Sequence, residues 1–113
     1  MALVDATWTQ PNVDVDRMRE HVREASELLK GMAHEGRLMI LCDLLHGEKS
    51  VGELEALQSG RQASVSQQLA RLRLEGLVSA RRDGRMIYYG IASDKARSII
   101  GVLYTSFCAT DGA

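Results

Sequence analysis

The chain has 113 residues and a formal net charge of −1, and this length fits one compact domain. So small a net charge excludes a protein that binds nucleic acid through its overall charge alone. The chain also lacks a run of the ~20 apolar residues that a membrane-spanning helix needs, and Asp5 stands where a signal peptide would be basic. We therefore expect a cytoplasmic protein with no membrane partner.

The first part of the chain divides into an arm and a helix. Residues 1–13 show no periodicity, and we expect a flexible N-terminal arm there, followed by a single domain over residues 14–113. Asp14 or Asp16 can cap a first amphipathic helix, because short acidic side chains accept hydrogen bonds from the first free amides. Apolar residues at helical spacing extend this helix to about Ala33.

Two more helices are expected next. Glu35 begins a second helix that is apolar almost all round, and Gly47 is typical of a residue that ends a helix. We therefore expect this helix to be buried. Ser50 and Glu53 form a capping-box pattern, which predicts the start of a short third helix.

A turn at Ser59 and Gly60 leads into a fourth helix over residues 63–75, which Gly76 closes. A short helix, a turn and a second helix form the helix-turn-helix pattern, in which the second helix enters the major groove of DNA. Its expected packing residues are Val65, Leu69, Leu72 and Leu74.

The chain continues with a predicted hairpin and a last helix. Residues 77–82 and 85–91 are strand-like and flank Asp83-Gly84, a strong two-residue hairpin signal. Ser93 can cap a fifth helix with an apolar stripe, formed by Ile99, Ile100, Leu103, Tyr104 and Phe107. The expected fold is mainly α with a β-hairpin wing, a winged helix-turn-helix in the order ααααββα.

The basic residues gather in the fourth helix and the hairpin. Residues 61–85 contain six arginines and two acidic residues, a net charge of +4, which leaves −5 for the rest of the chain. Such a face favours phosphate contact at one place. Solvation of an outer helix face is the ordinary alternative for such residues. The candidate DNA contacts are Ser64, Ser66, Gln67, Gln68 and Arg71 in the helix, and Arg81, Arg82 and Arg85 in the hairpin.

The segment SVSQQLARLRLEGLVSARRDGRMIYYGI resembles the recognition helix and wing of the ArsR/SmtB family of bacterial repressors. The resemblance covers about residues 16–109 and includes AHEGRLMIL at the start of the second helix. It implies a homodimer joined through the first and last helices, with a near-palindromic double-stranded operator DNA as the partner. No enzyme activity is expected.

Many repressors of this family respond to metals, and a zinc site needs about four closely placed Cys, His or carboxylate ligands. The three histidines, His21, His34 and His46, are isolated from one another, and the third helix has no Cys-x-Cys. We expect neither a metal site nor a cofactor.

The two cysteines, Cys42 and Cys108, stand 66 positions apart, and a reducing compartment does not favour a structural disulfide between them. Each could be an ordinary buried small hydrophobe. Their placement, after LMIL in the second helix and after Tyr-x-x-Phe in the fifth, resembles the dithiol of the BigR/SqrR group of ArsR-type repressors. That resemblance implies a redox-sensing pair, which releases DNA when reactive sulfur species such as persulfides or polysulfides cross-link it.

Other functions stay open at this point. The same dimer could sense peroxide through a disulfide, or a thiophilic metal through its thiols. A dithiol oxidoreductase has no support from a Cys-x-x-Cys motif. A protein-interaction module that uses the apolar stripe of the last helix would show no salt-dependent affinity for DNA.

Overall fold

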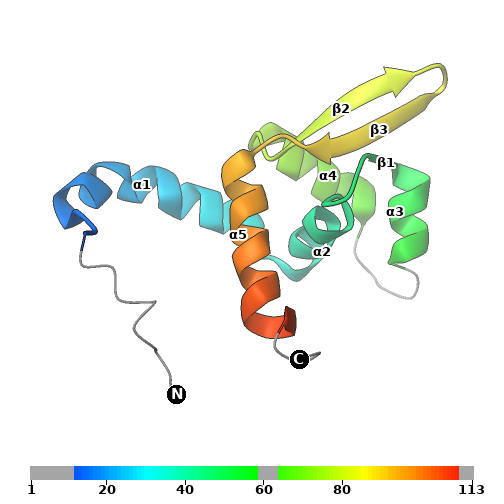
Figure 1. The fold of residues 1–113 in the computed structure, drawn as a ribbon. Helices are drawn as coiled ribbons and strands as arrows, with labels where there is room; N and C mark the ends of the chain where they lie inside the picture. The colour runs from blue at the N-terminus through cyan, green and yellow to red at the C-terminus, as the bar shows by residue number, and fades with distance from the viewer. Residues whose placement is uncertain (1–11, 59–63, 110–113) are drawn as a thin grey trace.

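The computed structural model describes residues 12–58 and 64–109, and it confirms a winged helix-turn-helix. Figure 1 shows the first helix extending away from the rest of the molecule, and a long hairpin projecting beyond the other helices. The elements are α1 (Val15–Met32), α2 (Glu35–Asp43), β1 (Lys49–Ser50), α3 (Val51–Leu57), α4 (Val65–Leu74), β2 (Val78–Asp83), β3 (Met86–Ile91), α5 (Asp94–Tyr104) and a π-helical turn (Thr105–Ala109).

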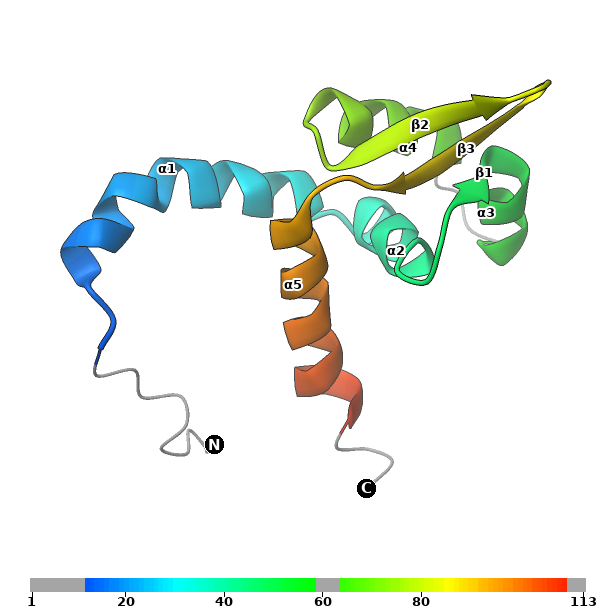
Figure 2. The ribbon, with the colours of Figure 1, turned by 45° about the horizontal axis from the view of Figure 1, so that its top comes forward.

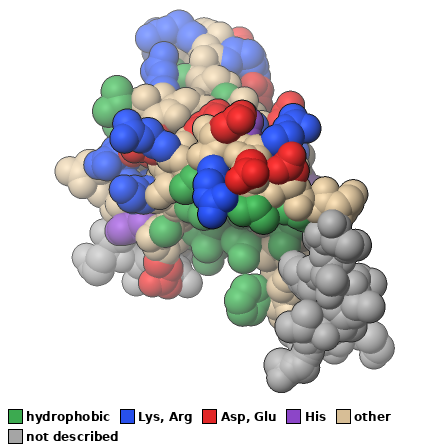
Figure 3. All heavy atoms as spheres, turned by 90° about the vertical axis from the view of Figure 1, so that its left-hand side faces the viewer, with side chains coloured by type: hydrophobic (Ala, Val, Ile, Leu, Met, Phe, Trp, Pro, Cys, Tyr) green, Lys and Arg blue, Asp and Glu red, His purple; other side chains and the backbone are tan. Residues whose placement is uncertain are grey.

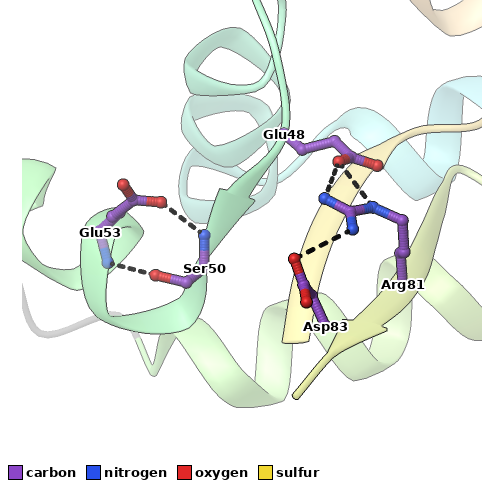
Figure 4. Close-up of polar contacts among 5 residues, drawn as sticks. All are labelled: Glu48, Ser50, Glu53, Arg81 and Asp83. Atoms are coloured by element: carbon purple, nitrogen blue, oxygen red, sulfur yellow. Dashed lines mark hydrogen bonds and ion pairs between the residues drawn. The ribbon is translucent and has the colours of Figure 1, made fainter. Parts of the chain in front are cut away.

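The predicted helix caps are formed as expected. The Asp14 side chain accepts hydrogen bonds from two amides of the first turn of α1, at 3.0 and 3.2 Å. Ser50 Oγ accepts from the amide of Glu53, and the Glu53 carboxylate accepts from the amide of Ser50, which completes the capping box at the start of α3 (Figure 4). Ser93 caps α5. These side chains satisfy amides that have no partner within their own helix.

Two features of the second helix differ from the prediction. The helix ends at Asp43, with the buried Leu44 as its cap, rather than at Gly47. The chain must leave the helix early because residues 49 and 50 pair with β3 as the short strand β1, which the sequence did not predict. The helix is also less buried than expected, since Cys42 is exposed.

Leu74 does not pack in the core, and the prediction that it does is wrong. Its relative exposure is 84%, whereas Leu69 and Leu72 are almost fully buried. Two residues correspond to about 200° around a helix, so Leu74 lies on the side of α4 opposite to Leu72.

The wing is a three-stranded antiparallel sheet in the order β1-β3-β2. Asp83 and Met86 are the last paired residues of the hairpin, so the turn consists of Gly84 and Arg85, one position later than predicted. Gly84 has a φ of +64°, a conformation that glycine adopts without strain.

The core lies where α2, α3, α4 and α5 meet the base of the hairpin. Its buried apolar residues are Met32, Ile40, Leu41, Leu44, Leu54, Val65, Leu69, Leu72, Leu77, Val78, Ala96 and Ile100. Most of α1 lies outside this core and extends away from it (Figure 2). The radius of gyration is accordingly 16.4 Å, against about 13 Å for a compact domain of this length.

One close approach joins α1 to the rest of the molecule. Gly31 is buried, and a Cβ at this position would collide with the carboxylate of Glu75 and come within 3.0 Å of Leu77. A larger residue at position 31 would therefore displace the end of the Glu75 side chain.

Most of the predicted arm lies outside the described residues, which begin at Asn12. In the described part of the chain, no helix is long and apolar enough to cross a membrane.

Candidate functional site

The helix-turn-helix presents the first half of α4 to solvent. Ser64 is the N-cap of this helix, and its side chain accepts a hydrogen bond from the amide of Gln67 at 3.4 Å. Ser66 and Gln67 are exposed, and Gln68 is half-buried. Because the opposite side of α4 is held in the core, these polar side chains form the outer surface that a DNA groove would meet.

Arg71, the last predicted contact on α4, is exposed and has an acidic partner. Its Nε lies 2.6 Å from Oε2 of Glu75, one turn later in the chain. This ion pair fixes the direction of the Arg71 side chain along the helix. Arg73 is also exposed at this end of α4 and was not among the predicted contacts, although its place in the arginine cluster could have indicated it.

The three predicted arginines of the wing have different surroundings. Arg81 donates two hydrogen bonds to Glu48, whereas Arg82 and Arg85 are exposed and form no ion pair with another residue that the structure describes. Sequence reasoning missed Glu48, because it precedes Arg81 by 33 positions and no local pattern joins them.

The two cysteines are both free and exposed, so the interpretation of each as an ordinary buried hydrophobe is wrong. Cys42 lies near the end of α2, and Cys108 lies in the π-helical turn that follows α5. The helices α2 and α5 contact each other. The structure thus brings the helix that carries Cys42 against the helix that leads into the turn with Cys108.

Cys42 lies in surroundings that oppose its ionisation. Partial burial raises the pKa of the Cys42 thiol, and the negative charges of Asp43 and of the Cys108 thiolate raise it further. Burial also raises the pKa of Asp43, whose Oδ2 is buried without a hydrogen-bond partner among the described residues. Both Cys42 and its neighbour are therefore in surroundings that disfavour negative charge.

No group of three or more His, Cys, Asp and Glu side chains in the described ranges is arranged to hold a metal ion.

The recognition helix, its preceding short helix and the basic hairpin define a DNA-binding regulator of the winged helix-turn-helix class. The family model for bacterial regulatory proteins of the arsR family matches residues 34–80. The chain is 46% identical over 99 residues to the biofilm growth-associated repressor of Agrobacterium fabrum, a match that covers 88% of this chain and 85% of the relative. The protein belongs to the ArsR family of transcriptional regulators.

Two further comparisons agree with this assignment. The crystal structure of the transcriptional repressor BigR from Xylella fastidiosa matches with a TM-score of 0.79 and 41% identity, over 86% of this chain and 99% of that one. The transcriptional activator HlyU of Vibrio cholerae is 38% identical, over 85% of this chain and 89% of the relative. These relatives are regulators of transcription, not enzymes.

Proposed function

We propose that this protein is a dithiol-based transcriptional repressor. It binds operator DNA when Cys42 and Cys108 are reduced, and it releases the DNA when reactive sulfur species link the two thiols. The observation that carries the proposal is the placement of two exposed thiols on a winged helix-turn-helix, one in α2 and one just after α5, where α2 and α5 are in contact. The likeness to proteins named as repressors supports the direction of control.

The output of the switch is DNA binding by α4 and the wing. Glutamine can pair with an adenine edge in two places, and serine can contact bases or the backbone. Exposed wing arginines supply affinity through phosphate. The proposed contacts are Ser64, Ser66, Gln67, Gln68, Arg71, Arg82 and Arg85.

The DNA-binding unit is a homodimer. Along α1, Val15, Met18, Val22 and Leu29 are each about half exposed, and on α5 and the following turn the exposed apolar residues are Val102, Tyr104 and Phe107. Figure 3 shows hydrophobic side chains gathered beneath a belt of charged ones on the side of the molecule where α1 lies. A second copy would cover this apolar surface, and a dimer would place two wings and two recognition helices on a near-palindromic site.

The chemistry begins with attack by one thiolate on the outer sulfur of a persulfide, R–S–SH. The cysteine becomes a persulfide, and the thiolate RS⁻ leaves. The second thiolate then attacks the cysteine sulfur of that persulfide, forming a disulfide and releasing HS⁻. Each further sulfur atom in the bridge requires a further equivalent of persulfide. In sum, the two thiols are oxidised and the sulfane sulfur is reduced to sulfide.

The link would change DNA affinity because it joins α2, which packs beside the DNA-binding helices, to the end of α5. A bridge that fits free dimers better than DNA-bound ones weakens operator binding by the difference. A coupling of about 1 to 3 kcal/mol lowers affinity about 5- to 150-fold.

The test is an anisotropy titration of a duplex selected from a random-sequence library by the reduced protein. Treatment with sodium tetrasulfide should weaken binding at least about fivefold, and equal affinities would refute the proposal. Cys42→Ser and Cys108→Ser should bind DNA like the reduced protein and lose the response. Intact mass distinguishes the inducers, since a bridge with added sulfur atoms indicates sulfur species, whereas release by hydrogen peroxide or by a thiophilic metal would indicate a different sensor.

A further inference from the structure

Glu48 contacts the wing from outside the hairpin. Its Oε1 accepts hydrogen bonds from Arg81 Nε at 3.0 Å and from Arg81 Nη2 at 2.8 Å (Figure 4). The hydrogen bonds from Arg81 lower the pKa of Glu48, and the same bonds raise the pKa of Arg81. Both groups are therefore ionised together over the whole neutral range of pH.

Gly90 lies in β3, between Glu48 and the strand that carries Arg81. Glu48 immediately precedes β1, Arg81 belongs to β2, and β3 runs between those two strands. A Cβ at position 90 would lie 3.2 Å from Glu48 Cγ, closer than such atoms normally approach. The Glu48 side chain thus crosses β3 at a residue without a side chain. We call the contact of Glu48 with Arg81 across Gly90 the wing clasp.

The guanidinium of Arg81 has two more neighbours, although 53% of the side chain is exposed. Its Nη1 lies 3.8 Å from the Asp83 carboxylate, and its Cζ lies 5.1 Å from the centre of the Tyr88 ring. Two carboxylates and an aromatic ring thus lie near one positive charge. A phosphate approaching Arg81 would therefore meet a largely neutralised group, in contrast to Arg82 and Arg85.

We propose that Arg81 and Glu48 are positioning residues for DNA binding: the wing clasp holds the hairpin at a fixed angle to the segment between α2 and α3, while Arg82 and Arg85 contact the phosphates. This inference rests on the proposed DNA-binding function and deepens it. The clasp holds β2 at Arg81, which pairs with Tyr88 in the outer half of the hairpin, and Arg82 and Arg85 lie beyond it toward the turn. A small change in the angle of the hairpin would therefore move these two arginines away from the DNA backbone. Glu48 lies between α2 and α3, and both of these helices contact α4. The clasp therefore fixes the position of the wing relative to the recognition helix α4.

Arg81 could contact phosphate directly or position the wing, and these two roles predict opposite effects of Glu48→Ala on DNA affinity. If Arg81 contacted phosphate and Glu48 competed for it, Glu48→Ala would tighten DNA binding. If the clasp positions the wing, Glu48→Ala weakens binding about two- to fivefold, the range expected for an exposed ion pair, even though it removes a negative charge. Glu55→Ala on α3 is the matched control for loss of one exposed acid.

A variant without any change of charge separates geometry from electrostatics. Gly90→Ala crowds Glu48 and should weaken binding in the same direction as Glu48→Ala. In the double variant the two effects should not add, because both substitutions disrupt one contact. Full additivity of the two effects would contradict the clasp.

The salt dependence completes the test. Anisotropy titrations with the selected duplex are repeated between roughly 50 and 200 mM salt. Arg82→Gln and Arg85→Gln should each reduce the slope of log K against log salt by about 1. Arg81→Gln should weaken binding and reduce the slope no more than Glu48→Ala does, because either substitution only displaces the tip arginines. A larger reduction of the slope by Arg81→Gln than by Glu48→Ala, or tighter binding by Glu48→Ala, overturns the inference. Absence of salt-dependent binding by the unmodified protein would overturn the proposed function and this inference with it.

Discussion

The raised pKa of Cys42 determines how the reaction rate of this thiol depends on pH. The thiolate is the nucleophile, and its fraction at a given pH falls as the pKa of the thiol rises. Partial burial, Asp43 and Cys108 all raise this pKa. At neutral pH, Cys42 therefore reacts more slowly than a thiol in water, and its rate increases with pH until the pH exceeds the raised pKa.

Replacing the neighbouring acid should accelerate this reaction. Asp43→Asn removes a negative charge beside Cys42, which lowers the pKa of the thiol and raises its alkylation rate near neutral pH by about threefold. The rate is measured for each cysteine separately, by iodoacetamide labelling and peptide mass spectrometry over a range of pH. The difference in alkylation rate should vanish at alkaline pH, where the Cys42 thiol is fully ionised in both proteins. Asp16→Asn, in the first turn of α1, is the control, and an unchanged or slower rate for Asp43→Asn would contradict this account.

The helices and strands follow mainly from local signals. The caps Asp14, Ser50 and Ser93 lie next to the helices that they begin, so a linear sequence is enough to identify them. The strand β1 was not predicted because two residues carry no periodicity, and only pairing with β3 makes them a strand. The turn at Gly84 was misplaced by one residue because register depends on the pairing of both strands.

The candidate site was predictable to a smaller extent. Its residue types, the polar start of α4 and the basic wing, are visible in the sequence. The partners of individual side chains are not, because Glu48 reaches Arg81 only through the order of strands in the sheet. The environment of Cys42 depends in the same way on a residue 66 positions later.

The two leucines near the end of α4 make the direction of this helix testable. Leu72→Ala removes a buried side chain and should lower the free energy of unfolding by about 2 to 5 kcal/mol. Leu74→Ala removes an exposed one and should change it by less than about 0.5 kcal/mol. Urea unfolding of the reduced proteins at one protein concentration measures both values, since the stability of a dimer depends on concentration. Similar losses for the two variants would show that α4 is rotated from the orientation described.

At the scale of the whole molecule, the extended shape leaves apolar surface that a second copy of the chain could cover. A chain with a radius of gyration of 16.4 Å leaves apolar surface of α1 uncovered, and the core of the winged helix lies to one side of it. Burial of such surface against a second copy would compensate for the small core of a short chain.

A charge within the apolar face of α1 should therefore separate the subunits. Val22→Glu places a carboxylate where the proposed interface is apolar, and burial of an unpaired charge is unfavourable. We expect a monomer in sedimentation velocity and a loss of DNA affinity of at least about tenfold, because two linked half-sites bind far more tightly than one. Glu20→Ala, on the opposite side of α1 by helical spacing, should remain dimeric. A Val22→Glu protein that stays dimeric and binds normally would place the interface elsewhere.

The close approach at Gly31 affects how a substitution at this position would act on the protein. Position 31 is far along the chain from α4. Nevertheless, a side chain there would displace the Glu75 carboxylate, which forms an ion pair with Arg71. A substitution at the end of α1 would thus reach Arg71, forty positions away, through Glu75. We expect such a substitution to alter DNA binding through this ion pair rather than through a DNA contact of residue 31.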